Sequence, residues 1–380
     1  MTRVAVSKTV LRWALERSVR REDVELKFPK LSEWLSSQSQ PTLRQLEAFA
    51  KATCTPLGFL FLAEPPVERL SIPHFRTLDG SMRGSSPDLL ETVQTMERRQ
   101  AWMREYLIEQ RQEPLKFVRS VRLADEFRLV ANQIRSTLGL DTQWASQQHT
   151  WTAALRELQK KMEEVGILVV VNGVVGNNNH RKLDVDEFRG FVLVDEYAPL
   201  VFVNGADGKA AQMFTLAHEL AHVWLGSSAA FDLRQLQPAD DATEQACNRI
   251  AAEFLVPEVE FSRFWTSITQ GQDRFQMIAQ QFKVSELVAA RRALDIGKIN
   301  RDEFLDFYRD YQERERRTTT GQEGGNFYAT QNLRISRRFA ETIVHAVSEG
   351  KLLYHEAYIL TGLHGQTFER FVQHLVGEPL

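Results

Sequence analysis

Cysteine is scarce in this chain of 380 residues, which contains only Cys54 and Cys247. Two cysteines exclude a disulfide scaffold. The sequence also has no Cys-x-x-Cys pair, which excludes a zinc ribbon or a metal cluster built on such pairs. The expected location is therefore a reducing cytoplasm.

Long apolar runs are also missing. The longest, near Gly166–Val171, is far shorter than the roughly 20 residues that cross a bilayer. The segment Met1–Lys8 leads directly into charged helical sequence and has no apolar region typical of a signal peptide. The sequence therefore predicts no membrane span, no export and no membrane partner.

Neither sign of charge is in excess, because 47 Lys and Arg stand against 50 Asp and Glu. This balance excludes a protein that coats nucleic acid through overall basic charge, so DNA binding requires a local surface. With 43% apolar residues, 20 Gly and 12 Pro, the chain is neither disordered nor fibrous. Its length exceeds the roughly 250–300 residues that one core organises, so several domains are expected.

Apolar residues at helical spacing predict helices along most of the chain, and β-prone runs occur only near its middle. The predicted strands are Ile167–Val171, Phe188–Val194 and Leu200–Asn204. Two helices follow, from about Asp207 to Leu225, before Gly226, and from about Asp241 to Leu255, before Pro257. Between the strands, Asn177–Lys182 with His180 is expected to be a polar loop, and the polar segment Thr318–Gly325 a break between helices. The predicted fold class is α+β, mainly helical, with a small β-sheet.

The first of these two helices contains the motif His218-Glu219-x-x-His222. Residues four apart lie on one helix face, so both imidazoles can reach a single metal ion while Glu219 lies beside a bound water. Catalytic zinc has three protein ligands and keeps a fourth position for water. The motif therefore predicts a zinc site with Glu219 as general base.

The third ligand is expected from the second helix, where Glu244 shares a stripe with Asn248, Ala251 and Leu255. Glu244 is the preferred candidate because this stripe faces the first helix. The alternatives are Asp240, Asp241, Cys247 and Glu253. Such a site would hydrolyse a peptide bond, and Phe188–Val194 or Leu200–Asn204, if at a sheet edge, could bind an extended substrate as an added strand.

These residues resemble the ImmA/IrrE family of zinc metallo-endopeptidases. The similarity covers the following segments of about residues 160–260: Phe188–Phe191, Pro199–Asn204, Phe214–His222 and Glu244–Pro257. The resemblance implies a zincin-like core with zinc bound by His218, His222 and Glu244 and with Glu219 as general base. It also implies that the substrate is a protein partner, a DNA-binding repressor or a similar regulator.

The N-terminal block is similar to an Xre-type helix-turn-helix domain. The similarity rests on Leu11–Ala14, Leu31–Thr42, Gln45–Lys51 and Pro56–Phe61. The chain departs from that pattern at Phe28–Leu31, where the usual unit has a glycine-containing turn, and at Trp34–Ser37. The residues expected to contact nucleic acid are Lys30, Ser36, Ser37, Gln38 and Gln40. Trp13 and Trp34 are expected in the core.

The sequence thus predicts four parts: a helix-turn-helix-like domain (1–66), a helical connector (67–160), a zincin-like peptidase core (161–260) and a helical C-terminal region (261–380). The predicted function is a cytoplasmic zinc-dependent endopeptidase that cleaves a protein partner. The alternative is a DNA-binding transcriptional regulator, or an antitoxin-like protein that binds a toxin partner, in a toxin-antitoxin or mobile-element locus.

Overall fold

A computed structural model describes residues 3–18, 21–68, 70–71, 85–227, 230–231, 241–269, 273–318 and 333–377. Parts of two predicted segments, the connector after residue 67 and the break at 318–325, lie outside these ranges. The chain divides into two compact units: residues 1–71 with 78–94, and residues 72–77 with 95–380. Each unit is described by itself.

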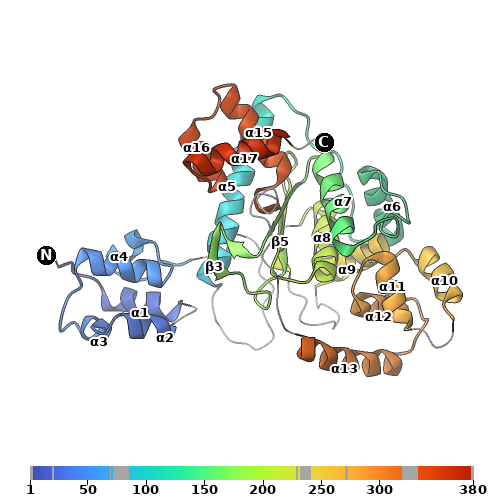
Figure 1. The fold of residues 1–380 in the computed structure, drawn as a ribbon, viewed down its shortest axis with the longest axis horizontal. Helices are drawn as coiled ribbons and strands as arrows, with labels where there is room; N and C mark the ends of the chain where they lie inside the picture. Colours follow the sequence, from blue (N-terminus) through green and yellow to red (C-terminus); the bar gives the residue numbers. More distant parts are fainter. Residues whose placement is uncertain are drawn as a thin grey trace. The chain divides into compact units, whose positions relative to one another are not determined.

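Unit 1 is a small helical unit (Figure 1). Its helices are α1 (Lys8–Glu16), α2 (Arg21–Lys27), α3 (Leu31–Leu35), α4 (Leu43–Ala52) and the 3-10 helix η1 (Leu57–Phe61). Thr42 begins α4 with a capping box, because its hydroxyl accepts from the backbone N of Gln45 and the Gln45 side chain accepts from the backbone N of Thr42. Phe28, Trp34 and Phe49 pack edge to face in the core, which confirms Trp34 as a core residue.

Unit 2 contains the sheet. Its strands are β1 (Leu168–Asn172), β2 (Val174–Val175), β3 (Asn178–Lys182), β4 (Gly190–Leu193), β5 (Leu200–Asn204) and β6 (Ala230–Phe231). The main sheet has the order β1-β5-β4-β6, with β1 and β5 parallel and the other pairs antiparallel. β5 and β4 therefore both lie inside this order, so the expectation that one of them could be an edge strand was wrong, although β6 pairs only with Gly190 and Phe191 of β4.

A two-stranded sheet stands beside the main one. β2 and β3 pair antiparallel, with Val174 opposite Lys182. The expectation of a polar loop over residues 177–182 was therefore wrong: these side chains are polar because β3 is exposed, and the backbone is a strand.

Helices cover the sheet and extend from it. They are α5 (Pro87–Glu109), α6 (Phe127–Leu138), α7 (Trp151–Glu164), α8 (Lys209–Leu225), α9 (Ala242–Leu255), α10 (Glu258–Ser267), α11 (Arg274–Phe282), α12 (Glu286–Asp295), α13 (Arg301–Thr318), α15 (Arg337–Ser348), α16 (Tyr354–Thr361) and α17 (Gly365–Gly377). Helices α10–α13 lie together, and α15–α17 form another group (Figure 1). The predicted fold class, α+β and mainly helical, is confirmed.

Helix α8 lies at the centre of the core of unit 2. It packs on β4 and β5 and, on another side, on α9. Every residue from Gln212 to Trp224 is buried, which a helix can achieve only when other elements surround it. The same core includes residues from α6 and α7, such as Ile134 and Leu158. No helix among the described residues is long and apolar enough to cross a membrane.

Candidate metal centre

The two histidines of the motif lie on the buried side of α8. His218 and His222 are 0% and 1% exposed, and their Nε2 atoms are 3.1 Å apart. The helix forms because Ala, Leu, Met and Gln dominate residues 209–221, and it ends at Gly226, whose φ of 82° is the left-handed conformation of a helix cap. The helical spacing therefore brings both imidazoles to one point.

Helix α9 brings Glu244 to the same point. One carboxylate oxygen of Glu244 lies 3.1 Å from His218 Nε2 and the other lies 3.2 Å from His222 Nε2. Glu244 lies in the first turn of α9, which packs directly on α8. The carboxylate is thus shared between the two imidazoles.

The alternative third ligands differ from one another in their surroundings. Asp241 begins α9, and its side chain accepts from the backbone N of Thr243 and Glu244. Glu253 forms a buried ion pair with Arg292. The sulfur of Cys247 lies within 4.8 Å of a ring nitrogen of each histidine, so it borders the same point. Asp240 lies outside the described residues.

The donor set fits a zinc ion. Ligands bound to tetrahedral zinc at about 2.0–2.1 Å lie about 3.3 Å from one another. The two Nε2 atoms are 3.1 Å apart, and the two oxygens of Glu244 lie at similar range, one 3.1 Å from His218 Nε2 and the other 3.2 Å from His222 Nε2. Two imidazoles with one carboxylate are also a donor set used by catalytic zinc. These three residues could therefore hold the ion without rearrangement of the backbone.

Glu219 is fully buried beside this point, and no donor among the described residues reaches either of its carboxylate oxygens. Burial, reinforced by the charge of Glu244, raises the pKa of Glu219 well above its usual value. A buried carboxylate without partners is costly in a fold that needs nothing from it. A bound cation and its water would compensate this cost.

Gly190, the first residue of β4, makes room for this arrangement. A Cβ atom at Gly190 would lie 2.5 Å from Thr215 Cγ2 and 3.4 Å from Glu219 Oε1. β4 can therefore approach α8 only with glycine here. Gly190 was not predicted as a site residue, although a glycine inside a β-prone run indicates a close backbone approach.

The surroundings of His218 and Glu244 favour the protonation states in which these two side chains can bind a metal. Burial lowers the pKa of His218, so its imidazole is held neutral, as a metal ligand must be. Burial alone would raise the pKa of Glu244, but the neighbouring His218 and His222 outweigh it and lower the pKa to about 2. Glu244 is therefore an anion at neutral pH.

Each imidazole is also held from its outer side. His218 Nδ1 lies 3.0 Å from Asn248 Oδ1, and His222 Nδ1 lies 2.9 Å from Ser227 Oγ. Asn248 was expected on the same helix stripe as Glu244 but without a role, and Ser227 was not predicted as a site residue. Two features of the sequence could have indicated these contacts: Asn248 lies four residues after Glu244, and Ser227 directly follows the glycine that caps α8.

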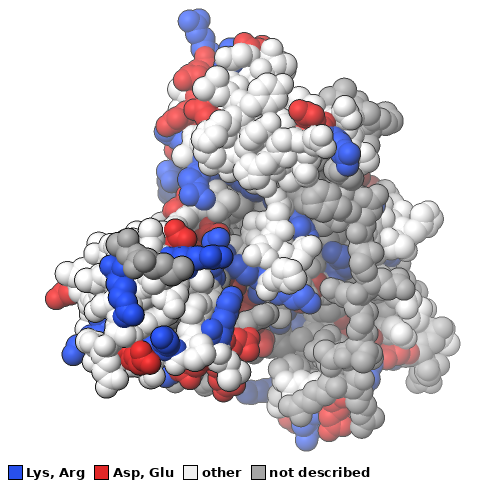
Figure 2. All heavy atoms as spheres, turned by 60° about the vertical axis from the view of Figure 1, so that its left-hand side comes forward, with Lys and Arg blue, Asp and Glu red and all other residues white. Residues whose placement is uncertain are grey.

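The residues predicted to contact nucleic acid lie directly before and after α3 of unit 1. Lys30, Ser36, Ser37 and Gln38 are exposed. Gln40 is half-buried, and its side-chain oxygen accepts from the backbone N of Val6. On the face that Figure 2 shows, Lys and Arg are interspersed with Asp and Glu. These contacts with nucleic acid stay a prediction.

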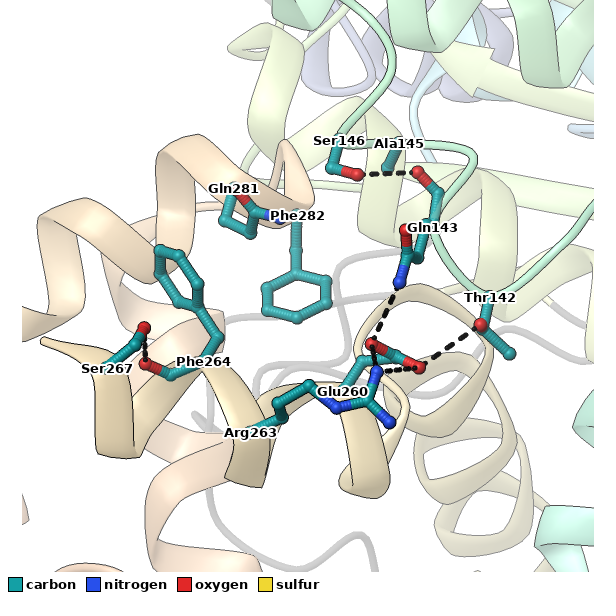
Figure 3. Close-up of a pocket in the computed structure, with 10 residues that line it drawn as sticks. All are labelled: Thr142, Gln143, Ala145, Ser146, Glu260, Arg263, Phe264, Ser267, Gln281 and Phe282. Carbon is teal, nitrogen blue, oxygen red and sulfur yellow. Dashed lines mark hydrogen bonds and ion pairs between the residues drawn. The ribbon is translucent and has the colours of Figure 1, made fainter.

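A separate hollow of about 300 Å³ lies between the segment 142–146, α10 and α11 (Figure 3). Phe264 and Phe282 form its apolar part, and Glu260 pairs with Arg263 at 2.9 Å. Its lining is Thr142, Gln143, Ala145, Ser146, Glu260, Arg263, Phe264, Ser267, Gln281 and Phe282, with no histidine or cysteine among them. The metal centre therefore does not share this hollow.

Residues 162–294 match the family model of the IrrE N-terminal-like domain, Peptidase_M78. The matched residues include the sheet and helices α8 and α9, so this part of the chain is similar to a metallopeptidase family and supports a protease-type function. Residues 335–374, which include α15 and α16, match a domain of unknown function, DUF8813. No curated protein matches the chain. Neither family match includes unit 1.

Proposed function

We propose that the chain is a zinc-dependent endopeptidase that cleaves a protein partner. The observation that carries the proposal is the convergence of His218, His222 and Glu244 within 3.1–3.2 Å of one another, beside the buried and unpartnered carboxylate of Glu219. The match of residues 162–294 to a peptidase family supports it.

The chemistry follows from the residue types. A zinc ion held by His218, His222 and Glu244 would polarise the substrate carbonyl and lower the pKa of a water toward about 7. Glu219 takes the proton of the attacking water and transfers it to the leaving amine. The raised pKa of Glu219 suits the second step, the delivery of the proton to the leaving amine. A cation bound beside it would lower this pKa and so favour the carboxylate that the first step needs.

The substrate is proposed to bind as an extended segment beside β4, the strand whose first residue borders Glu219. β4 pairs with β5 on one side and, through Gly190 and Phe191, with β6 on the other. The resemblance to the ImmA/IrrE family motivates a DNA-binding repressor or similar regulator as the substrate.

The proposal is tested in cells that express either the wild-type chain or Glu219→Gln, with comparison of all new protein N-termini. Bound metal is measured on both purified chains. We expect one zinc per chain in both, and a cleaved partner only with wild type. An identical set of cleavage products from the variant would remove Glu219 from the mechanism, and a chain without metal would refute the zinc site.

A DNA-binding regulator is the second candidate, and the geometry of unit 1 favours it. Helices α2 and α3 are joined by a three-residue turn, Phe28–Lys30, as in a helix-turn-helix motif. Lys30 and Gln38 are exposed at this turn and after α3. However, α2 also exposes Glu22, Asp23 and Glu25, which would repel phosphates.

Gel shifts with the DNA upstream of the chain's own gene test this candidate. Sequence-selective binding that weakens with salt and survives His218→Ala with His222→Ala would support regulation as an independent activity. If Lys30 contacts a phosphate, Lys30→Ala should make the slope of the logarithm of the binding constant against the logarithm of salt concentration shallower by about one. Binding with no salt dependence would contradict this candidate.

A further inference from the structure

We propose that Asn248 and Ser227 are positioning residues of the metal centre. Each holds the outer nitrogen of one histidine and so keeps the inner nitrogen available to the metal. The inference rests on the proposed zinc site and adds two residues that are not ligands.

The contact of Asn248 determines the tautomer of His218. Asn248 Oδ1 lies 3.0 Å from His218 Nδ1. An amide oxygen can only accept, so Nδ1 must carry the hydrogen and donate it. Nε2 then has a free lone pair, and it is the atom that lies 3.1 Å from both His222 Nε2 and Glu244. The hydrogen bond thus keeps His218 in the form that can bind a metal.

Helix α9 supplies this support together with a ligand. Glu244 and Asn248 are four residues apart on α9, so both lie on the face that packs on α8. A shift of α9 would move the carboxylate and the amide together. The spacing therefore links the position of the third ligand to the orientation of the first.

Ser227 reaches His222 because of the cap that ends α8. Gly226 has a φ of 82°, and the chain turns back so that Ser227 N donates to His222 O at 3.3 Å. This turn places Ser227 Oγ 2.9 Å from His222 Nδ1. A Cβ atom on Gly226 would lie 2.3 Å from Arg119 Cγ, so the turn requires glycine. The hydroxyl can accept from Nδ1, so this contact allows His222 the same tautomer as His218.

Both supporting groups are uncharged, and this fits their surroundings. The centre already buries the carboxyl groups of Glu219 and Glu244. A third carboxylate would add like charge to that cluster. An amide and a hydroxyl orient the imidazoles without this cost, so their contribution is geometric.

The test is the zinc affinity of the purified full-length chain, measured by competition with a chromophoric chelator. Loss of such outer contacts typically lowers metal affinity about 10–100-fold. We expect Asn248→Leu and Ser227→Ala to show a loss in this range. Ser227→Thr, which keeps the hydroxyl, should stay within about threefold of wild type. Asn248→Asp keeps an acceptor but adds like charge, so it should lose less affinity than Asn248→Leu, whereas a general packing role would not be rescued in this way.

Arg249→Ala is the matched control, because Arg249 is the exposed neighbour of Asn248 on α9. Circular dichroism of the metal-free chains shows whether each variant folds. Ser227 follows the helix, so Ser227→Ala keeps the test valid if Asn248→Leu does not fold. The inference alone would be overturned if Asn248→Leu and Ser227→Ala both fold and bind zinc with wild-type affinity. It would also be overturned if Asn248→Asp and Ser227→Thr lose as much zinc affinity as Asn248→Leu and Ser227→Ala. A wild-type chain that binds no zinc would overturn the proposed function and this inference with it.

Discussion

Two of the charged side chains that unit 2 buries, Glu219 and Arg99, differ in their surroundings. At the metal centre, Glu219 is fully buried without any donor among the described residues. Beside α15–α17, Arg99 is also buried, but its guanidinium donates to the backbone carbonyls of Leu360, Arg334 and Thr361 at 2.9, 3.0 and 3.5 Å. Arg99 therefore supports the fold, whereas Glu219 is a cost to it.

The difference provides a way to separate structural from functional polar groups in a core. A buried group that stabilises the fold has its partners within the chain, and its removal leaves them unsatisfied. A buried group that serves chemistry has partners supplied by a ligand, and its removal leaves the fold intact. The following predictions test this distinction.

The largest effect is expected for Glu219→Gln. Loss of the proton acceptor should reduce cleavage of the partner about 10²–10⁴-fold. Because Glu219 has no donor to lose, the melting temperature should not fall. Cleavage and melting temperature are both measured on the purified chain. Glu260→Gln, the same substitution in the separate hollow between α10 and α11, is the control. A marked loss of stability in Glu219→Gln would contradict the distinction.

Arg99→Met should have the opposite signature. It leaves three carbonyls without their donor, so the stability of helices α15–α17 should fall by about 3–5 kcal/mol. Hydrogen exchange of amides in these helices measures the effect locally. Arg98→Met, at the exposed neighbour, should change it by less than about 0.5 kcal/mol. Equal effects of the two variants would show that the buried contacts contribute nothing.

Glu163 on α7 gives the contact with α15 a pH dependence. Its Oε1 accepts from Ser336 Oγ at 2.5 Å, and burial raises its pKa from 4.5 to about 7. The folded chain therefore binds more protons than the unfolded chain between these values. Stability should fall as pH rises through this window, by up to about 3 kcal/mol, and level off above it.

Glu163→Gln tests this dependence, because glutamine keeps an acceptor for Ser336 but does not ionise. Hydrogen exchange of α15, followed from about pH 5 to 8, should show a decline in the wild type that the variant lacks. A decline of the same size in the variant would assign it to other groups.

Removal of metal should have the smallest effect on stability. Zinc at 100 times its dissociation constant stabilises a folded chain by about 2.7 kcal/mol. Chelation should therefore lower the melting temperature of both wild type and Glu219→Gln, because His218, His222 and Glu244 remain in both. Thermal melts with and without chelator measure this shift. A melting temperature insensitive to chelator would argue against a bound ion.

Local pattern was sufficient to predict the helices that carry the centre. The helix expected from about Asp207 to Leu225 spans Lys209–Leu225, and the one expected from about Asp241 to Leu255 spans Ala242–Leu255. Both agree because helix periodicity and end signals are encoded within a few residues. The proximity of His218 and His222, four residues apart, likewise follows from the helix alone.

Features that depend on distant residues were not predictable in this way. The order of the strands, the pairing of β2 with β3 and the position of β6 arise from contacts between separate segments. The contact of Asn248 with His218 joins residues 30 positions apart. The roles assigned to Glu219 and Glu244, and the boundaries of the four predicted parts, stay predictions.

The short strand β6 has a consequence for the proposed binding of a peptide along β4. β6 already pairs with Gly190 and Phe191 on β4, and Gln100 Nε2 donates to Leu193 O at 2.7 Å on the same strand. A peptide that lies along β4 must therefore exchange with a segment of the chain itself. The affinity of such a peptide would then be the difference between its own pairing with β4 and the pairing of β6 with β4.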